Sequence, residues 1–527
     1  MTEYITCQFV ASHRQSNMKE ASSPSSMATA EVVSSPPELT ESSNNFTIFA
    51  NTINGKASLN GRKTQAINPS TRRPLWDVPV ATDDDINTAV GAAKTAFENW
   101  SRTPWKERAT YIDRAKEALM DIRDGMASLI MQEAGKPLQF AKMEVDHSAR
   151  FLSFYSSHPE LETRVVSDDY ELRLTVKYVP MGVVAAICPS IHPLLLAVAK
   201  IGAGLITGNT VIVKPSPFTP YSTLKFVDYI KSIFPPGVIQ ALSGDETLGP
   251  KLVEHPDIQK IAFTGSTATG KKVMAAASKT LKRVTLGLSG NNACIICPDI
   301  DVSVVAPQVS VGAFLNSGQS CLATRRIYIH EDIYQEFMQH MIDVVKLWKA
   351  SPSLPGAGNI LGPIQNEIRY RHVKQIVEES KQKGLNFAFG NAEFDEDNHF
   401  VIQPAIIDTP PHDSPVMMEE AFGPIISLFP WKDEQEVINR VNDIKTGLGA
   451  SLWSGDMDHA VAIGEQIQAG MVTINSHPAP LPSGFLSGWK ESGLGGELGT
   501  EGLLSYCNAQ TLYCHKLPVG PGSAEAD

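Results

Sequence analysis

Short apolar runs alternate with helical patterns between residues 180 and 265, and this alternation indicates the fold class. Val183–Ile187 is apolar at every position, as expected of a strand buried on both faces. Further strands are predicted at Val211–Val213, Gly237–Gln240 and Ile261–Phe263, and helices at Pro193–Leu205 and Ser222–Ile233. We therefore predict an α/β fold with a doubly wound parallel sheet, in which ligands bind at the carboxyl ends of the strands.

Two further segments carry a clear pattern. Thr82 precedes three aspartates and an apolar stripe at helical spacing, which predicts a helix that Thr82 caps and whose positive end the aspartates stabilise. Apolar and polar residues alternate from Tyr170 to Tyr178, which predicts a strand with one face in water. Such a strand suits a hairpin arm or a sheet shared between subunits.

The composition is that of a globular protein and excludes several classes of function. Apolar residues make up 42% of the 527 positions and charged residues 19%. The 45 Lys and Arg residues against 57 Asp and Glu residues give a net charge of −12, and without a basic run we expect no nucleic-acid partner. No run reaches the roughly 18 apolar residues that span a bilayer, and the N-terminus lacks the apolar segment of a signal peptide. We therefore expect a cytoplasmic protein with no membrane partner.

The composition of the two chain ends predicts flexible tails, and the spacing and surroundings of the cysteines argue against disulfides and a metal site. Residues 1–45 are rich in serine and are expected to form a flexible tail, with a second tail at residues 516–527. The seven cysteines are too scattered for a disulfide framework. Cys294 and Cys297 have the spacing of a redox pair or of half a zinc site. Their apolar surroundings favour two small buried strand residues instead, and we predict no metal site.

A glycine-rich loop and a lysine are candidates for nucleotide binding. Six residues join a predicted strand to a predicted helix: Gly265, Ser266, Thr267, Ala268, Thr269 and Gly270. Backbone amides in such a loop can approach a phosphate at the positive end of the helix, although an ordinary turn is the alternative. A P-loop is excluded, because Lys272 occupies the position that needs Ser or Thr for magnesium. Lys214 ends another predicted strand, where it could reach a ribose or phosphate or could be a solvated charge.

Cys321 is the candidate nucleophile. It follows Gly318 and Gln319 and has small neighbours, so its backbone setting is accessible. Helix amides, or basic residues such as the nearby Arg325 and Arg326, could depress its pKa. The alternative is an inert buried cysteine.

Five segments, in order, resemble those of the NAD(P)-dependent aldehyde dehydrogenase superfamily, from about Phe46 to Tyr513. They are Gly208–Ser216, Phe263–Thr267, Gly318–Cys321, Glu419–Pro424 and Lys490–Gly495. The resemblance implies a doubly wound nucleotide-binding domain, an α/β catalytic (thiol) domain and a β oligomerisation arm. The first would span residues 46–160 and 181–287, the second residues 288–503, and the arm residues 161–180 and 504–515.

The resemblance also implies roles for single residues. Cys321 would form a thioester with the substrate, a small aldehyde. Lys214 would contact the adenosine ribose of NAD or NADP, and the loop Gly265–Gly270 would contact the nucleotide. Glu420 would hold the nicotinamide ribose, with Phe422 beside it. The arm implies a homodimer or homotetramer.

The chain departs from this family at two catalytic positions. Relatives hold the oxyanion with an asparagine and activate the hydrolytic water with a glutamate, whereas Ile191 and Gly287 stand at those positions here. Loss of one oxyanion donor typically slows the reaction by about 10²–10³, and loss of a general base by about 10²–10⁴. His192 has a pKa suited to a replacement base, or it simply packs. Pro217 replaces an acid that many relatives use for a ribose hydroxyl, so the sequence does not separate NAD from NADP.

Three functions are therefore open. The favoured one is NAD(P)-dependent oxidation of an aldehyde through Cys321, in a fungal-type member with altered motifs that serves a specialised biosynthetic pathway (secondary metabolism). The second is an acyl-transfer or reductive enzyme on the same scaffold, with an acyl substrate and an acyl-cysteine that is not hydrolysed. The third is a catalytically dead binding protein that keeps the fold. The sequence does not identify the aldehyde.

Overall fold

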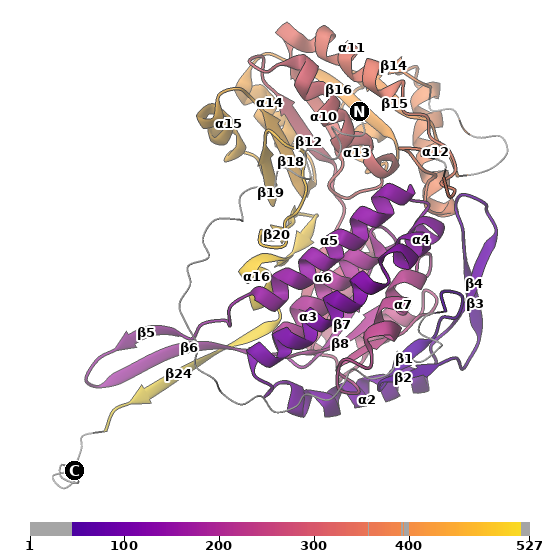
Figure 1. Ribbon diagram of the computed structural model, residues 1–527. Helices are drawn as coiled ribbons and strands as arrows, with labels where there is room; N and C mark the ends of the chain where they lie inside the picture. The colour runs from indigo at the N-terminus through magenta and orange to yellow at the C-terminus, as the bar shows by residue number, and fades with distance from the viewer. Residues whose placement is uncertain (1–44, 357, 392–393, 395–399, 518–527) are drawn as a thin grey trace, which may run out of the picture. The chain divides into compact units, whose positions relative to one another are not determined.

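The computed structural model describes residues 45–356, 358–391, 394 and 400–517, and these residues form two large sheets and a small one (Figure 1). The described residues belong to one compact unit. The tails expected at residues 1–45 and 516–527 lie outside the described residues, except for Asn45, Lys516 and Leu517.

The first sheet has eight strands in the order β2-β1-β9-β8-β7-β10-β11-β22. The five strands from β9 to β11 in this order pair in parallel, and β1, β2 and β22 pair antiparallel at the edges. The chain runs from β7 to β8 and β9 on one side, and then to β10 and β11 on the other. The bounds are β1 (Asn51–Ile53), β2 (Lys56–Ser58), β7 (Val183–Ile187), β8 (Thr210–Lys214), β9 (Ile239–Ala241), β10 (Lys260–Thr264), β11 (Arg283–Gly287) and β22 (Gly493–Leu494).

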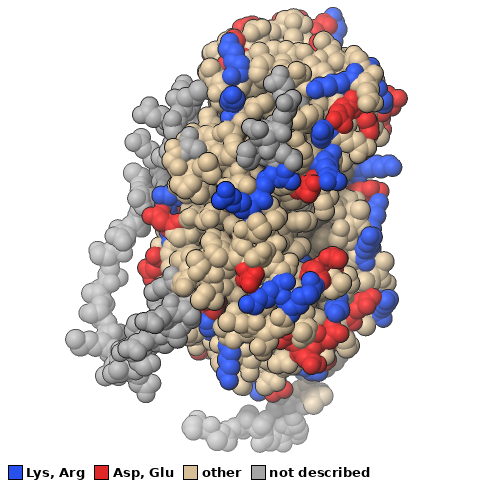
Figure 2. All heavy atoms as spheres, turned by 90° about the vertical axis from the view of Figure 1, so that its right-hand side faces the viewer, with Lys and Arg blue, Asp and Glu red and all other residues tan. Residues whose placement is uncertain are grey.

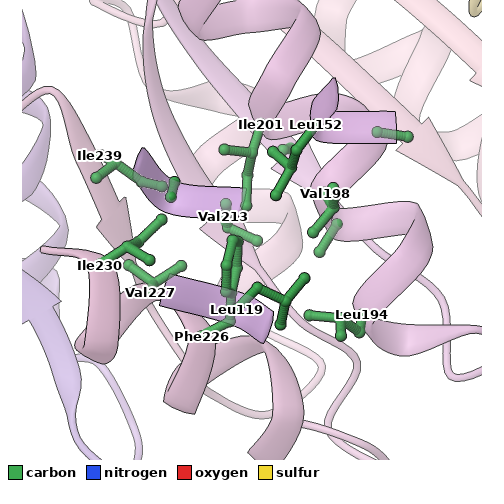
Figure 3. Packing of buried hydrophobic residues seen from close by; sticks show 14 of the residues in the cluster. Leu119, Leu152, Leu194, Val198, Ile201, Val213, Phe226, Val227, Ile230 and Ile239 are labelled. Atoms are coloured by element: carbon green, nitrogen blue, oxygen red, sulfur yellow. The ribbon is translucent and has the colours of Figure 1, made fainter. Parts of the chain in front are cut away.

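Helices cover both faces of this sheet. Val184 and Ala186 of β7 join one buried cluster, and their alternate neighbours Val183, Ala185 and Ile187 join the opposite one. The first cluster, part of which is shown in Figure 3, packs α3 (Trp105–Asp121), α4 (Arg123–Ala134), α5 (Leu138–Ser157), α6 (Pro193–Ile206) and α7 (Tyr221–Ile230) against the sheet. The second packs α2 (Asp83–Trp100), α8 (Leu248–Glu254) and α9 (Thr267–Ala277). The predicted doubly wound parallel sheet is confirmed.

The helix starts follow local chemistry. The Thr82 hydroxyl accepts from Asp85 N, and the Asp85 carboxylate accepts from Thr82 N, so the expected cap of α2 is present in both directions. Helix α6 begins at a proline, which is well suited to the first helical position. Helix α7 ends at Ile230, three residues before the predicted Ile233.

The second sheet has seven strands in the order β14-β15-β16-β13-β12-β18-β19, all parallel except β14. Its strands are β12 (Asn292–Ile296), β13 (Thr324–His330), β14 (Asn386–Phe389), β15 (Ala405–Asp408), β16 (Ile425–Trp431), β18 (Gly449–Trp453) and β19 (Met471–Ile474). Its helices are α10 (Val302–Phe314), α11 (Tyr334–Val345), α12 (Glu367–Gln382), α13 (Pro415–Met418), α14 (Glu434–Asn442) and α15 (Met457–Gly464). Cys294 is buried within β12, and Cys297 is buried just after it.

A three-stranded antiparallel sheet extends away from the helices (Figure 1), in the order β24-β6-β5. The bounds are β5 (Arg164–Asp168), β6 (Leu172–Pro180) and β24 (Cys507–His515), so the alternating strand predicted at 170–178 is present two residues later. Val165, Val166 and Tyr513 on it are at least half exposed. Short pairs complete the fold: β3 (Lys63–Ile67) with β4 (Pro74–Pro79), β17 (Thr446–Gly447) with β21 (Trp489–Lys490), and β20 (Leu486–Ser487) with β23 (Gly496–Glu497); α16 (Gly499–Leu504) precedes β24.

The surface mixes both signs of charge. On the face shown in Figure 2, Lys and Arg side chains of the described residues are interspersed with Asp and Glu side chains. Of the described helices, none combines the length and apolar character needed to cross a membrane.

Candidate active site

A cavity of about 930 Å³ lies where the carboxyl ends of β7, β8 and β10 meet loops of the second sheet. The first sheet contributes the segment after β7 up to Ile191, then Lys214 at the end of β8 and Thr264 at the end of β10. Loops attached to the second sheet contribute Cys321 and Glu420. Because the strand order reverses between β7 and β10, this is the switch point at which open parallel sheets bind ligands.

The glycine loop enters the cavity in part. Gly265, Ser266 and Thr269 line it, whereas Thr267, Ala268 and Gly270 do not. The Ser266 hydroxyl caps α9 by accepting from Thr269 N at 3.3 Å. The N-terminus of α9, where the helix dipole is positive, therefore borders the cavity. This is the arrangement in which helices bind anions.

Both glycines of this loop lie in close packing. A Cβ at Gly265 would lie 2.5 Å from Phe263 Cζ, and one at Gly270 would lie 2.5 Å from Leu288 Cδ2. Thr267 faces another way, with its hydroxyl donating to the carbonyl of Glu491 at 3.1 Å.

Lys214 is buried at the cavity wall, with 6% of its surface exposed, so it is not the solvated surface charge that the sequence left open. Its Nζ donates to Pro215 O at 3.2 Å. Burial lowers the pKa of Lys214 to about 8, because the charged ammonium loses hydration. A hydroxyl or an anion bound in the cavity would give the Lys214 ammonium a hydrogen-bond partner in place of the lost water.

Cys321 lines the same cavity and is partly exposed to it. The tight loop before it contains Asn316, Ser317 and Gly318, all with positive φ. A side chain on Gly318 would lie 2.4 Å from Gly423 O, so this loop packs directly on the one that carries Glu420. Asn292 Nδ2 donates to Cys321 O at 2.7 Å, which fixes the backbone of this candidate nucleophile.

The expectation of a depressed thiol pKa is wrong. Burial raises the pKa of the Cys321 thiol to about 12, and the Glu420 carboxylate adds to the rise. The two arginines that could have lowered it are committed to backbone carbonyls. Arg325 donates to Gly318 O and Gly423 O, and Arg326 Nε donates to Asn291 O at 3.0 Å.

Glu420 and Phe422 follow α13 and face the cavity. Gly290 N donates to Glu420 Oε1 at 3.3 Å, and the Ser289 hydroxyl is a further hydrogen-bond partner. Burial raises the pKa of Glu420, while the guanidinium groups of Arg325 and Arg369 oppose the rise. The Arg369 guanidinium carbon lies 4.8 Å from the ring centroid of Phe422.

Ile191 and Gly287, the two positions at which the resemblance implies changed catalytic residues, differ in their surroundings. Ile191 lines the cavity, so an apolar side chain stands there. Gly287 ends β11 and is not one of the cavity-lining residues. A Cβ at Gly287 would lie 3.3 Å from Thr264 Oγ1, and its φ is not in the left-handed region, so a side chain is accommodated with a small adjustment.

His192 is not brought to the thiol. It does not line the cavity, and its Nδ1 lies 2.9 Å from Lys136 Nζ within a buried ion pair of Lys136 with Glu144. Burial and the Lys136 ammonium lower the pKa of His192. The packing interpretation therefore describes this histidine better than the replacement-base interpretation.

Two side chains of the site carried no signal in the sequence. Arg369 shares no motif with Phe422, and its position over the ring is set by the packing of α12 on the Glu420 loop. Lys200 is fully buried in α6, where Nζ donates to Thr264 Oγ1 and Glu497 Oε1, both at 2.8 Å. Its apolar sequence neighbours give no sign of a partner far along the chain.

Comparisons with known proteins agree over most of the chain. A model of the aldehyde dehydrogenase family matches residues 56–512. The chain is 42% identical over 473 residues to a protein of Gibberella moniliformis named FUS7, covering 90% of this chain and 100% of that one. It is 39% identical over 472 residues to aldehyde dehydrogenase LUC3 of Fusarium sp., covering 89% and 100%. A solved NAD⁺ complex of aldehyde dehydrogenase from Bacillus cereus superposes with a TM-score of 0.87 at 29% identity, covering 91% and 99%. An NADP-dependent enzyme from E. coli gives the same TM-score and identity, covering 91% and 100%.

Proposed function

Because the chain belongs to the aldehyde dehydrogenase family, we propose that it is an NAD- or NADP-dependent oxidoreductase that oxidises an aldehyde through a thioester on Cys321. The observation that carries this proposal is the shared cavity, in which the thiol-bearing residue, buried Lys214 and the glycine loop meet. The fungal origin of similar chains such as LUC3 supports a role in a specialised biosynthetic pathway.

The cavity fits a dinucleotide. Its wall offers a capped helix N-terminus for phosphate, a buried ammonium for a ribose hydroxyl, and a carboxylate for a second ribose. We assign Gly265 to Gly270 to the phosphate side, Lys214 to the adenosine ribose, and Glu420 with Phe422 to the nicotinamide end. When bound, the nicotinamide accepts a hydride from the substrate. A Bacillus cereus relative binds NAD⁺ and an E. coli relative depends on NADP, so both cofactors are retained in the proposal.

The chain's own residues supply the covalent step. The Cys321 thiol loses its proton to solvent and its sulfur bonds to the aldehyde carbonyl carbon, while the carbonyl electron pair moves to oxygen. The resulting oxyanion lies within reach of the Cys321 backbone N–H. Ile191 cannot donate a hydrogen bond to that oxyanion. With one donor fewer, we expect the covalent step to be slower by about 10²–10³ than with an asparagine at this position.

The remaining parts of the proposal concern organisation. We assign nucleotide binding to residues 46–160 and 181–287, and the thiol to residues 288–503. The small sheet, residues 161–180 and 504–515, is proposed as an arm that holds a homodimer or homotetramer together. Its partly exposed apolar side chains and unpaired edges support this role. We place the enzyme in the cytoplasm.

The test is nucleotide reduction by a Cys321→Ala variant. With an aldehyde panel and NAD⁺ or NADP⁺, the unaltered protein should form reduced nicotinamide and a carboxylic acid, and the variant should form neither. Cys514→Ala is the matched control, because Cys514 is exposed on β24. Full activity of Cys321→Ala would end the proposal, and so would nucleotide binding by the unaltered protein without turnover of any aldehyde.

A second function is favoured by Gly287. Without the glutamate of relatives, the acyl-cysteine could be passed to another thiol or an amine, or be formed from a thioester in the reductive direction. Mass spectrometry of the Cys321 peptide under turnover distinguishes the two functions. A long-lived acyl adduct that an added thiol discharges would support acyl transfer, and absence of the adduct would support hydrolysis.

A further inference from the structure

Two acidic side chains line the cavity among the described residues, Glu246 and Glu420. Glu246 is an exposed residue just before α8, on the first sheet's side of the cavity. Glu420 lies on the loop that packs against the one preceding Cys321. Glu420 is therefore the candidate for a carboxylate that takes a proton from a water molecule near the thiol.

Gly290 connects Glu420 to the nucleophile. Its N–H donates to Glu420 Oε1 at 3.3 Å, and a Cβ on its Cα would lie 2.5 Å from Cys321 O. The carboxylate and the nucleophile's backbone thus flank one buried glycine residue. The two side chains also interact electrostatically, because the Glu420 carboxylate adds to the rise in the pKa of Cys321.

We propose that Glu420 is the general base that activates water for hydrolysis of the acyl group on Cys321, in place of the carboxylate absent at Gly287. The inference rests on the proposed thioester function. Once the reduced nucleotide has left and its ribose no longer engages Glu420, the water oxygen bonds to the thioester carbonyl carbon while one water proton passes to a Glu420 oxygen. The carbon–sulfur bond then breaks, the carboxylic acid leaves, and Glu420 returns the proton to the Cys321 thiolate.

The surroundings of Glu420 keep it in place and tune its basicity. Burial raises its pKa, which strengthens a carboxylate as a base. The guanidinium groups of Arg325 from β13 and Arg369 from α12 act in the opposite direction. His372, also from α12, contacts the Glu420 backbone carbonyl through Nε2 at 3.3 Å and lines the same cavity.

Three other buried or partly buried glutamates are committed elsewhere. Glu144 pairs with Lys136 and accepts from the first amides of α6, and Glu133 accepts from Tyr221 N and Ser222 N at the start of α7. Glu497 pairs with Lys200. None of these three carboxylates lines the cavity, so none has the access to solvent in it that the base needs.

The experiment uses the full-length protein without nucleotide and p-nitrophenyl acetate as the probe. This activated ester acetylates a nucleophilic cysteine with a burst of nitrophenol, and later turnover reports deacylation. In Glu420→Gln we expect an unchanged burst amplitude and deacylation slower by about 10²–10⁴, with acetyl-Cys321 accumulating in mass spectra. Glu419→Gln is the matched control, since Glu419 is exposed and outside the cavity lining.

The pH profile separates a base from a structural role. In the unaltered protein deacylation should rise with pH through one ionisation above the ordinary carboxyl range, and in Glu420→Gln this rise should disappear. Glu420→Asp keeps a carboxylate and should keep the pH dependence at a lower rate. Deacylation of Glu420→Gln at the unaltered rate, or no deacylation by the unaltered protein, would overturn the inference while leaving the thioester in place. Absence of a burst that depends on Cys321 would instead overturn the proposed function.

Discussion

The packing of α5 on α6 depends on a glycine, and this dependence gives a sharp test of the fold. Gly202 lies in the interior of α6, and the first turn of α6 follows the cavity-lining segment that ends at Ile191. A Cβ built on it would lie 2.2 Å from Cδ2 and 2.7 Å from Cε2 of Tyr155 on α5. The Tyr155 ring is 1% exposed and belongs to the main buried cluster, so it has no free space into which to move. Gly202→Ala should therefore destabilise the protein.

The expected size follows from two opposing effects. Alanine is the better helix former by about 1 kcal/mol, and overpacking of a tight core typically costs about 1–3 kcal/mol or more. Because the contact is far inside van der Waals distance, we expect the upper part of that range and a net loss of about 2 kcal/mol. Gly91→Ala in α2 is the control, since a Cβ there meets nothing within 4 Å and only the helix propensity changes. It should stabilise by about 0.5–1 kcal/mol.

Thermal unfolding followed by circular dichroism measures both variants at one protein concentration, because oligomerisation makes Tm concentration-dependent. The two variants should shift in opposite directions and differ by roughly 3 °C in Tm, because unfolding a chain of this length has an entropy of about 1 kcal/mol/K. A Gly202→Ala variant that melts at or above the temperature of Gly91→Ala would refute the reasoning, because it would show that α5 and α6 separate without loss.

Three further predictions test the site and its supports. In a Cys514→Ser background without nucleotide, the rate at which iodoacetamide alkylates Cys321 should keep rising up to about pH 11. The thiol pKa is raised to about 12, so the thiolate fraction still grows there. A plateau of the rate near pH 8 would contradict this. Lys214→Met should weaken nucleotide binding by about tenfold or more in calorimetry, because a charged hydrogen bond is lost, and equal affinity would exclude the assigned contact. Lys200→Met breaks the pair with Glu497 and should lower the free energy of unfolding in urea by about 3–5 kcal/mol. Lys279→Met breaks an exposed pair and should change it by about 0–1 kcal/mol. Similar losses in the two variants would contradict the role of burial.

Much of the first sheet could be predicted because its signals are local. Val183–Ile187 has the same bounds in the structure as in the prediction, and α6 begins at the predicted Pro193. A run of apolar residues on both faces and a proline at the first helical turn act within a few residues. The bounds shifted where tertiary contacts compete, as at β6, which begins at Leu172 because its partner β24 sets the register from Pro180 to Leu172.

The chemistry of the site was only partly predictable. The motifs that resemble the family correctly led to the family, and the structure brings Lys214, Cys321 and Glu420 to one cavity. The sequence left open whether the thiol pKa is depressed or the cysteine is buried, and burial raises this pKa, while the neighbouring Arg325 donates to backbone carbonyls. The position of Arg325 shortly after Cys321 in the sequence did not indicate where its guanidinium points.

The amino-acid sequence by itself determined the alternation of strands and helices, and the family. Those properties are written in residue types and short spacings, so they need no knowledge of distant contacts. Only the tertiary structure decided the burial of Lys214 and the proximity of Glu420 to Cys321 across Gly290. Solvation and charge interactions depend on what surrounds a group in space, and here the surroundings come from segments a hundred or more residues apart, as the 130-residue separation of Gly290 and Glu420 shows.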